Sequence, residues 1–556
     1  MSKGENEMKK SGTEKTIREV FLRNHGCHSI SEVNNWFLKA KKNQYRLQGT
    51  DEFLKILVKF KYKKILVVGD YDADGICASA NFVIGLKSAG FKYVRTRIPT
   101  RKEGYGLSKK IVKEAIDSGT DLIVTCDNGI TQLEEVQFAK QNGISVIITD
   151  HHEPLEELPM ADCICNPHIK KEGDYCGATI VYLLMKEIAK QKAITQMCAF
   201  ATIATIGDIV SLTEYNYVLV RQGLRILEDK KSLPSGLRSL INISYLSRIT
   251  AKDLAFIICP IINAPERMYD GGANDMLKLL LFDGDCKTAK KLAAKCIKIN
   301  EARKSATKKA LILAEKEIQE DTGDIIILYL PEVSAGLLGI VAGQVKSKYE
   351  KPTILLSNTE GTIRASCRSS GEIHIKQMLD SCNGYFEKYG GHENAGGFTL
   401  KASVKIEEFM EAARDYAKKH IKQSKKEAEY DLEINSDQID ATISELQQYE
   451  PFGKGNPQIR FLIKDCQAIA DGKYCKIGRE GKKVRFKIAN ASVFSYSHNN
   501  EFKELQNKPF VVDLLGTLSQ NKYMGKLYNQ IQFTDFLLKD KKKKISAIAE
   551  KMLSIR

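Results

Sequence analysis

The chain has 556 residues, of which 43% are hydrophobic and 28% charged, which is enough apolar material for several cores and about three to four domains. Its net charge of +16 makes a polyanionic partner plausible, although lysines used for solubility would give the same value. The first residues contain no apolar segment of the signal-peptide type, and no stretch approaches the ~18 apolar residues of a membrane span. The 14 cysteines show no CxxC pairs, which indicates reduced thiols. We therefore expect a cytoplasmic protein with no membrane partner.

The predicted elements change in character along the chain. Residues 1 to about 60 predict a polar tail followed by amphipathic helices. From residue 64, the β-rich runs "KILVVGD", "YVRTRIP", "DLIVTCD" and "ISVIITD" alternate with helical stretches, which predicts a parallel sheet covered on both faces. A mostly helical region from about 176 to 320 ends in a long lysine-rich helix, and a second α/β unit begins at "DIIILYL". Short strands with Gly and Asn turns then predict a small barrel, and "KDKKKKISAIAEKML" predicts a solvated basic helix.

Three of the four predicted strands end in acidic residues. The side chains concerned are Asp70, Asp72 and Asp74 after the first run, Asp127 after the third, and Asp150, His151 and His152 after the fourth. Ligands of an open parallel sheet bind beyond the carboxyl ends of its strands, so we expect these side chains to converge there. Carboxylates this close repel one another and raise each other's pKa, so cations are needed to hold them together.

The residue types indicate which cations these are. Aspartate and histidine without thiolates favour Mn²⁺ or Mg²⁺ over structural zinc. Two such ions about 3.5–4 Å apart could activate a water molecule and stabilise the leaving oxygen of a phosphodiester. A single Asp after a strand is usually a turn residue or a helix N-cap, but three strands that end in this way favour a metal site.

These motifs resemble a known family. "GDYDADG", "CDNGI" and "TDHH" are similar to the first three motifs of the DHH phosphoesterase family, and Asp208 in "ATIATIGDIVSL" looks like its fourth. The resemblance implies that Asp72, Asp74, Asp127, His151 and Asp208 are metal ligands, with Asp70 as a ligand or an outer carboxylate. It further implies catalytic roles for Asp150 and His152, which would orient ligands or polarise the substrate.

A glycine-rich loop, "KYGGHENAGGF" at residues 388–398, resembles the GGH motif of the associated DHHA1 domain, although alone it would be read as a plain turn. The resemblance implies that Gly390 and Gly391 let the backbone approach a phosphate or sugar, and that His392 offers its ring to the scissile group. This sequence departs from the pattern at "EVSAGLLGIVA", where Val333 and Ser334 stand in place of a usual Trp-His pair. The glycines of that segment predict close helix packing.

The last part of the chain narrows the resemblance to the RecJ family of single-strand exonucleases. "PFGKGNPQIRF" at residues 451–461 and the strand-rich tail look like its OB-fold domain, and "IPTRKEGYGLS", "YCGA", "INAPERMYD" and "RASCRSSGEIHI" are also similar. The implied fold is α/β: a parallel-sheet DHH domain joined by a long helix to an α/β DHHA1 domain, plus a C-terminal β-barrel (OB-fold). The expected boundaries are 1–60 for the tail and first helices, 61–215 for DHH, 216–320 for the connector, 321–425 for DHHA1, 426–540 for the OB-fold and 541–556 for a basic tail.

Substrate contacts are expected within these motifs. Arg101, Arg267 and Arg368, with the Ser366 hydroxyl, could bind a terminal phosphate bidentately, and Tyr105 lies in the same motif as Arg101; surface salt bridges are the alternative for the arginines. An OB-fold binds single strands through basic and stacking aromatic side chains. The candidates there are Lys454, Lys473, Lys476, Arg485, Phe486 and Tyr523.

The resemblance implies an exonuclease dependent on two Mn²⁺ or Mg²⁺ ions that degrades single-stranded DNA from 5′ to 3′ to mononucleotides in recombination and repair. Its expected partners are single-stranded DNA and a helicase or single-strand-binding protein. Two alternatives stay open. One is a phosphodiesterase of the same superfamily that acts on RNA, short oligonucleotides or cyclic dinucleotides. The other is a non-catalytic single-strand-binding relative, against which the intact acidic set argues.

Overall fold

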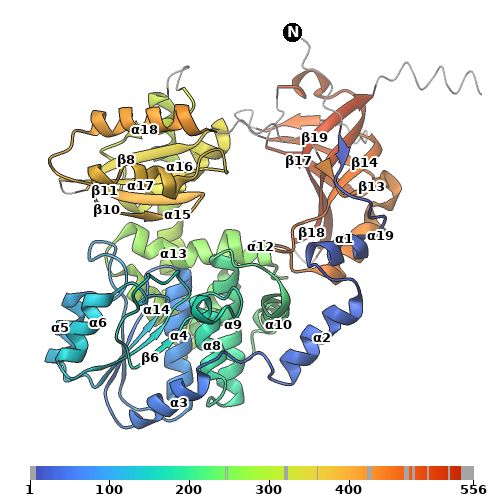
Figure 1. Ribbon diagram of the computed structural model, residues 1–556. Helices are drawn as coiled ribbons and strands as arrows, with labels where there is room; N and C mark the ends of the chain where they lie inside the picture. Colours follow the sequence, from blue (N-terminus) through green and yellow to red (C-terminus); the bar gives the residue numbers. More distant parts are fainter. Residues whose placement is uncertain are drawn as a thin grey trace, which may run out of the picture.

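The computed structural model in Figure 1 contains two stacked α/β units and a β-rich body beside them. It describes residues 8–244, 246, 248–318, 323–359, 361–421, 429–468, 475–478, 483–496, 500–523 and 526–539. Within these ranges, no helix has both the length and the apolar character needed to cross a membrane. All 14 cysteines are free thiols.

The first α/β unit is built on a five-stranded sheet of order β3-β2-β4-β5-β6, in which all neighbouring strands are parallel. The strands are β2 (Ile65–Val68), β3 (Val94–Arg97), β4 (Leu122–Cys126), β5 (Ser145–Thr149) and β6 (Cys163–Cys165). One face packs on α4 (Ala73–Ser88), α8 (Gly177–Met185) and α9 (Gln191–Gly207), and the other on α5 (Lys109–Asp117) and α6 (Leu133–Gln141). Every residue of β2 and β4 is buried between these layers, which confirms the predicted doubly covered sheet.

A helical connector links the two α/β units. It consists of α10 (Glu214–Asp229), α11 (Ser235–Ile243), α12 (Ala251–Asp253), the π-helical η1 (Leu254–Ile258), α13 (Cys259–Met268), α14 (Gly272–Leu281) and α15 (Cys286–Glu317). The 32-residue α15 is the predicted long helix, and the Asp285 side chain caps its first turn. Helix α15 contacts α11 and α13 of the connector and α16 (Ala335–Tyr349) of the second unit.

The second α/β unit has a mixed sheet of order β10-β11-β9-β8-β7. Its strands are β7 (Ile326–Tyr329), β8 (Thr353–Thr359), β9 (Thr362–Arg368), β10 (Phe386–Gly391) and β11 (Ala395–Leu400). Only β7 and β8 are parallel, and the other pairs are antiparallel. The helices α15 and α16 (Ala335–Tyr349) share one core with the sheet, while α17 (Ile375–Ser381) and α18 (Ile406–His420) share the other.

The β-rich body is a seven-stranded sheet of order β13-β14-β18-β19-β17-β16-β15. Its strands are β13 (Leu432–Asn435), β14 (Arg460–Gln467), β15 (Cys475–Ile477), β16 (Val484–Ile488), β17 (Ala491–Ser495), β18 (Val511–Tyr523) and β19 (Lys526–Lys539). Together with α19 (Ile439–Leu446) they enclose one hydrophobic core. The predicted basic tail, from residue 540 onward, lies outside the described residues.

The N-terminal segment bridges the β-rich body and the first unit, a connection that the sequence did not predict (Figure 1). Strand β1 (Lys9–Lys10) pairs with β12 (Glu429–Tyr430), and α1 (Ile17–Asn24) follows. Val20 of α1 is part of the β-rich core, whereas Phe21 packs against Tyr217 of α10. The chain then reaches β2 through α2 (Ile30–Lys41) and α3 (Thr50–Lys59).

Candidate active site

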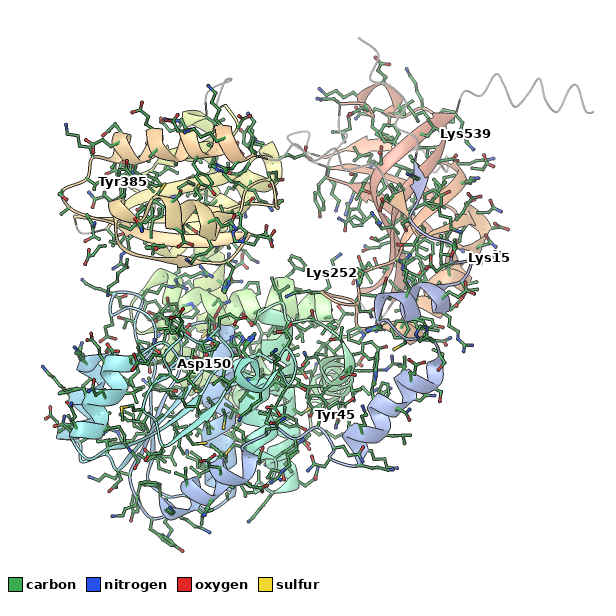
Figure 2. All side chains as sticks on the ribbon, in the orientation of Figure 1. Lys15, Tyr45, Asp150, Lys252, Tyr385 and Lys539 are labelled. Atoms are coloured by element: carbon green, nitrogen blue, oxygen red, sulfur yellow. The ribbon has the colours of Figure 1, made fainter. Side chains whose placement is uncertain are left out.

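The acidic residues gather at the carboxyl edge of the first sheet, in the loops that follow β2, β4 and β5 and at the end of α9 (Figure 2, near the label of Asp150). After β2 the chain continues to β3 on one side of the sheet, and after β4 it continues to β5 on the other side. The loops after β2 and β4 therefore diverge, which makes this the switch point of the sheet. Asp72 caps α4, since its Oδ1 accepts hydrogen bonds from the N–H groups of Asp74 (2.9 Å) and Gly75 (3.1 Å). A Cβ at Gly75 would lie 2.5 Å from the Asp70 backbone, so only glycine lets this turn close.

His151 lies at the centre of the cluster. Its Nε2 is 3.0 Å from Asp127 Oδ1 and 3.8 Å from Asp74 Oδ2, and its Nδ1 is 3.8 Å from Asp208 Oδ2. Asp127 also belongs to a second group with Asp70 and Asp72, whose ligand atoms all lie within 4.8 Å of one another. Asp127 is therefore the carboxylate that lies between the two groups.

The carboxyl groups are buried without enough positive charge to balance them. Burial raises the pKa of Asp70 and Asp127 well above the usual range, and neighbouring carboxylates raise it further. Burial together with the charges of Asp74 and Asp72 raises the pKa of Asp208 to about 8. Asp70 Oδ1 and Asp127 Oδ1 are buried and accept no hydrogen bond. Hard divalent cations coordinate such oxygens, so the donor set fits Mn²⁺ or Mg²⁺.

The first turn of α8 holds Asp74, although no residue of this helix was among the predicted site residues. Its two oxygens accept hydrogen bonds from the N–H groups of Gly177 (2.6 Å) and Ala178 (2.8 Å), which form the first turn of α8. The positive end of the helix dipole thus faces this carboxylate. A Cβ at Gly177 would lie 2.6 Å from Asp127 Cβ, so the glycine of "YCGA" is the sequence signal for this contact.

Asp150 supports the cluster from behind rather than entering it. It accepts hydrogen bonds from the N–H groups of Ile130 (3.0 Å) and His151 (2.8 Å), and His152 Nδ1 is 2.8 Å from its Oδ1. Burial alone would raise the pKa of Asp150, but the hydrogen bond and charge of His152 lower it. Burial alone would lower the pKa of His152, but Asp150 raises it to about 9. The Tyr105 hydroxyl donates to the Asp127 carbonyl oxygen (2.7 Å) and lies 3.1 Å from His152 Nδ1.

The arginine set, defined as Arg101, Arg267 and Arg368, lies between the two α/β units. The guanidinium of Arg101 stacks on the Tyr71 ring, 4.4 Å from its centroid. Arg267 Nη1 donates to the Gly336 carbonyl oxygen (3.0 Å), and Arg368 Nη1 donates to Ser366 Oγ (3.0 Å).

The positive charges of several arginines lie close enough to Arg267 to lower its pKa. Burial, together with the charges of Arg101, Arg303 and Arg368, lowers the pKa of Arg267 to about 10. Among the described residues, no carboxylate forms an ion pair with the arginine set, so the predicted surface salt bridges are not observed. Arg303 of α15 was not predicted, because it lies in a lysine-rich helix and outside every motif.

The glycine-rich loop forms the turn between β10 and β11. Gly391 has φ +154, and a Cβ there would lie 2.5 Å from the Ala395 carbonyl oxygen, whereas Gly390 has open space around it. The backbone N–H of His392 donates to Ala395 O (2.7 Å), and its side chain is exposed. The hydrogen bonds and ion pairs of the described residues do not join His392 to the carboxylate cluster.

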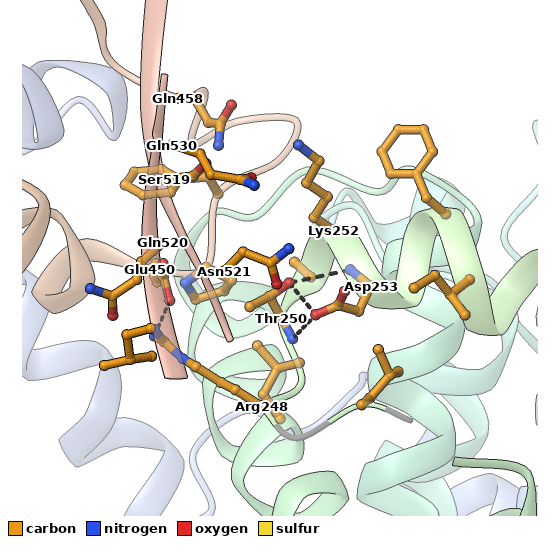
Figure 3. A pocket seen from close by; sticks show the side chains of 18 residues that line it. Arg248, Thr250, Lys252, Asp253, Glu450, Gln458, Ser519, Gln520, Asn521 and Gln530 are labelled. Carbon is orange, nitrogen blue, oxygen red and sulfur yellow. Dashed lines mark hydrogen bonds and ion pairs between the residues drawn. The ribbon is translucent and has the colours of Figure 1, made fainter. Parts of the chain in front are cut away.

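A groove of two adjoining cavities lies between the helical connector and the β-rich body. A pocket of about 270 Å³ lies between the Arg248–Ile257 segment and the β18–β19 hairpin, and Lys252 extends into it opposite Gln458 and Gln530 (Figure 3). An apolar cavity of about 500 Å³ adjoins it and includes Lys252, Lys454 and Ile209, the residue after Asp208. Its Phe256 is 73% exposed. The lining of this cavity thus includes residues on both sides of Asp208 in the chain.

The predicted single-strand contacts on the β-rich body are only partly supported. Phe486 is only 3% exposed and packs against Phe502 in the core, so the prediction that it stacks on bases is wrong. Apolar and charged residues alternate along β16, so Phe486 shares the buried face with Val484 and Ile488, a pattern that the sequence already contains. Lys454 lines the groove, while Lys473 and the Tyr523 side chain lie outside the described residues.

Family models match three parts of the chain: the DHH family N-terminal domain over residues 64–207, the DHHA1 domain over 322–419 and the RecJ OB domain over 430–535. The single-stranded-DNA-specific exonuclease RecJ of Haemophilus influenzae is 30% identical over 476 residues, which are 78% of this chain and 82% of the relative. The Thermus thermophilus enzyme of the same name is 30% identical over 481 residues, 85% of this chain and 68% of the relative.

Two solved structures have the same architecture. The crystal structure of Thermus thermophilus RecJ in complex with Mn²⁺ matches with a TM-score of 0.74 and 27% identity, over 89% of this chain and 72% of that chain. A structure of exonuclease RecJ bound to manganese matches with a TM-score of 0.57 and 30% identity, over 67% of this chain and 95% of that chain.

Proposed function

Because this chain belongs to the RecJ family of single-stranded-DNA-specific exonucleases, we propose that it hydrolyses single-stranded DNA from an end with the help of two Mn²⁺ or Mg²⁺ ions. The observation that carries this proposal is the carboxylate cluster, in which the buried Asp70 Oδ1 and Asp127 Oδ1 accept no hydrogen bond. The proposed nuclease activity serves DNA recombination and repair.

The residues that would hold the two ions are Asp70, Asp72, Asp74, Asp127, His151 and Asp208, and Asp127 would be within reach of both groups. When bound, such ions lower the pKa of a water molecule and stabilise the leaving oxygen of a phosphodiester. Asp150 fixes the orientation of the loop that carries His151. His152 keeps its proton at neutral pH, since its pKa is about 9, and so presents positive charge to a phosphate beside Tyr105.

The arginine set, with the Ser366 hydroxyl, is proposed to bind the terminal 5′-phosphate, which gives 5′ to 3′ polarity. A terminal phosphate carries one more negative charge than an internal one, and planar guanidinium groups bind it bidentately. Gly390, Gly391 and His392 remain proposed substrate contacts from the second unit.

Single-stranded DNA is the proposed partner along the groove, where Phe256 offers a stacking surface and Lys252 and Lys454 offer charge. A helicase or a single-strand-binding protein would supply or hold such strands. We propose the domain boundaries 61–215, 216–320, 321–425 and 426–540 for the four working parts.

The test is a nuclease assay on one DNA oligonucleotide labelled at either end, as a single strand and as a duplex, with Mn²⁺ or with chelator. We expect metal-dependent release of mononucleotides from the 5′ end of the single strand alone. Release from the 3′ end would contradict the polarity, and equal cleavage of an RNA strand would favour the RNA or oligonucleotide alternative. Binding without hydrolysis would favour the non-catalytic relative.

A further inference from the structure

A cavity of about 680 Å³ lies beside the arginine set, at the junction of the two α/β units. Its walls come from the loop after β3, the end of α13, the start of α16 and the β8–β9 hairpin. Arg101 and Arg267 line it together with Arg364, Val333 and Ser334. This volume is within the range of small-molecule sites, roughly 300–1,000 Å³.

The walls of this cavity carry four basic side chains, Arg101, Lys102, Arg267 and Arg364, and three acidic ones, so a net positive charge remains. Arg101 Nε is buried and has no hydrogen-bond partner, and Arg364 Nη1 lies 3.4 Å from the Arg101 carbonyl oxygen. The one buried carboxylate, Glu266, accepts hydrogen bonds from the backbone N–H groups of Arg101 and Ala273, both at 2.9 Å. The other two acidic residues of the wall, Asp270 and Glu332, are exposed. An anion inside the cavity would therefore meet guanidinium groups first.

The start of α16 adds to the wall of the cavity. Val333 and Ser334 both line it, and their side chains are small. Ser334 precedes α16, so the positive end of that helix dipole also faces this space. A larger side chain at position 334 would therefore take up part of this volume.

We propose that this cavity binds the additional phosphates of a single strand whose 5′ nucleotide carries a di- or triphosphate. The inference rests on the proposed function, because Arg101 and Arg267 belong both to the cavity wall and to the set assigned to the terminal phosphate. Phosphates attached to that group would extend into the cavity.

The reaction itself is unchanged. Water adds to the phosphorus of the first internucleotide linkage, the bond from phosphorus to the 3′ oxygen breaks, and that oxygen takes a proton. The first product is then a nucleoside 5′-triphosphate, and later products are monophosphates. A polymerase that starts a strand de novo leaves such an end.

The experiment compares one DNA oligonucleotide with a 5′-hydroxyl, 5′-monophosphate or 5′-triphosphate end, and identifies the first product by chromatography. Three variants are assayed beside the wild type: Ser334→Trp fills the cavity, Arg364→Ala removes charge from its wall, and Arg414→Ala on α18 is the control for loss of an exposed arginine. We expect the wild type to degrade the triphosphate and monophosphate strands at comparable rates. Ser334→Trp and Arg364→Ala should slow the triphosphate strand alone, by about tenfold for each lost charged contact.

The possible results separate the two proposals. A wild type that degrades the monophosphate strand but not the triphosphate strand overturns the inference and leaves the proposed function intact. An Ser334→Trp variant that slows both strands equally also overturns it, because the cavity would then not be a separate subsite. No hydrolysis of any strand by the wild type overturns the proposed function and the inference with it.

Discussion

Asp127 has an unusual backbone conformation and also presents a carboxylate oxygen to the proposed metal site. Its φ of 63° lies in the left-handed region, which is rare for residues other than glycine and asparagine or aspartate. Its backbone N–H donates to the Thr149 carbonyl oxygen (3.0 Å), and this turn directs Oδ1 to within 3.0 Å of His151 Nε2. The residue at this position must therefore tolerate left-handed backbone and also supply a ligand atom.

Asp127→Asn separates these two demands, because asparagine accepts the same backbone conformation without the charge. We expect hydrolysis to fall by more than about a hundredfold, since even partners of a metal ligand are worth ten- to a hundredfold. Affinity for a single strand should stay near that of the wild type.

The metal-free variant should also unfold at a higher temperature than the metal-free wild type. Folding raises the pKa of this carboxyl above its unfolded value, so the wild type loses stability as the pH rises through the acid range toward neutrality. Thermal unfolding in chelator between pH 5 and 8 measures this difference. Near-normal turnover by the variant would remove Asp127 from the site.

At the scale of residues, the sequence predicted which side chains meet because parallel strands bring their carboxyl ends to one edge. It could not show that the Asp150 carboxylate takes part in four hydrogen bonds behind the cluster, since neighbouring positions in a sequence do not reveal which side chain points into the site. Arg303 was missed for a related reason: its neighbourhood with Arg267 depends on how α13 packs against α15.

At the scale of elements, two helices bring glycines to very different surroundings. Gly177 starts α8 and touches Asp127, whereas Gly343 lies within α16 and has no atom within 4 Å of its position for a Cβ. The predicted close packing of the α16 glycines thus holds for Gly336, which contacts the Arg267 backbone, and not for Gly343.

Gly177→Ala and Gly343→Ala form a matched pair. The first should destabilise the protein by about 1–3 kcal/mol through overpacking and reduce hydrolysis, because the added methyl group displaces Asp127. The second should stabilise the protein by up to about 1 kcal/mol, as alanine favours a helix interior more than glycine does. Chemical unfolding and nuclease assays of both variants test this. Equal losses of stability and hydrolysis in the two variants would show that the contact between Gly177 and Asp127 does not matter for the site.

For the whole molecule, the order of the parts was predictable from the sequence, whereas their arrangement was not. Changes in hydrophobic periodicity along the chain indicate sheets, a long helix and a barrel, since each of these is specified by a local residue pattern. The bridge made by α1 is not local: Val20 belongs to the barrel core and Phe21 packs on α10 of the helical connector, more than 400 and almost 200 residues from their partners. The polar tail and amphipathic helices predicted for residues 1–60 did not reveal this contact between the parts, which the Arg248–Glu450 ion pair (2.7 Å) reinforces.

Val20→Asp should release this contact, because a buried valine replaced by an unpaired charge no longer fits the barrel core. The barrel would then be held to the rest of the molecule by its linker and by weaker contacts, and its effective concentration over the groove would fall. We expect affinity for long single strands to drop by about tenfold or more, with a shallower dependence on salt, since fewer phosphates are contacted at once. Oligonucleotides too short to reach the barrel should be hydrolysed as before. Small-angle scattering should show a larger radius of gyration, and Val20→Ala serves as the milder control. A Val20→Asp protein that stays compact and binds long strands normally would mean that α1 does not fix the barrel over the groove.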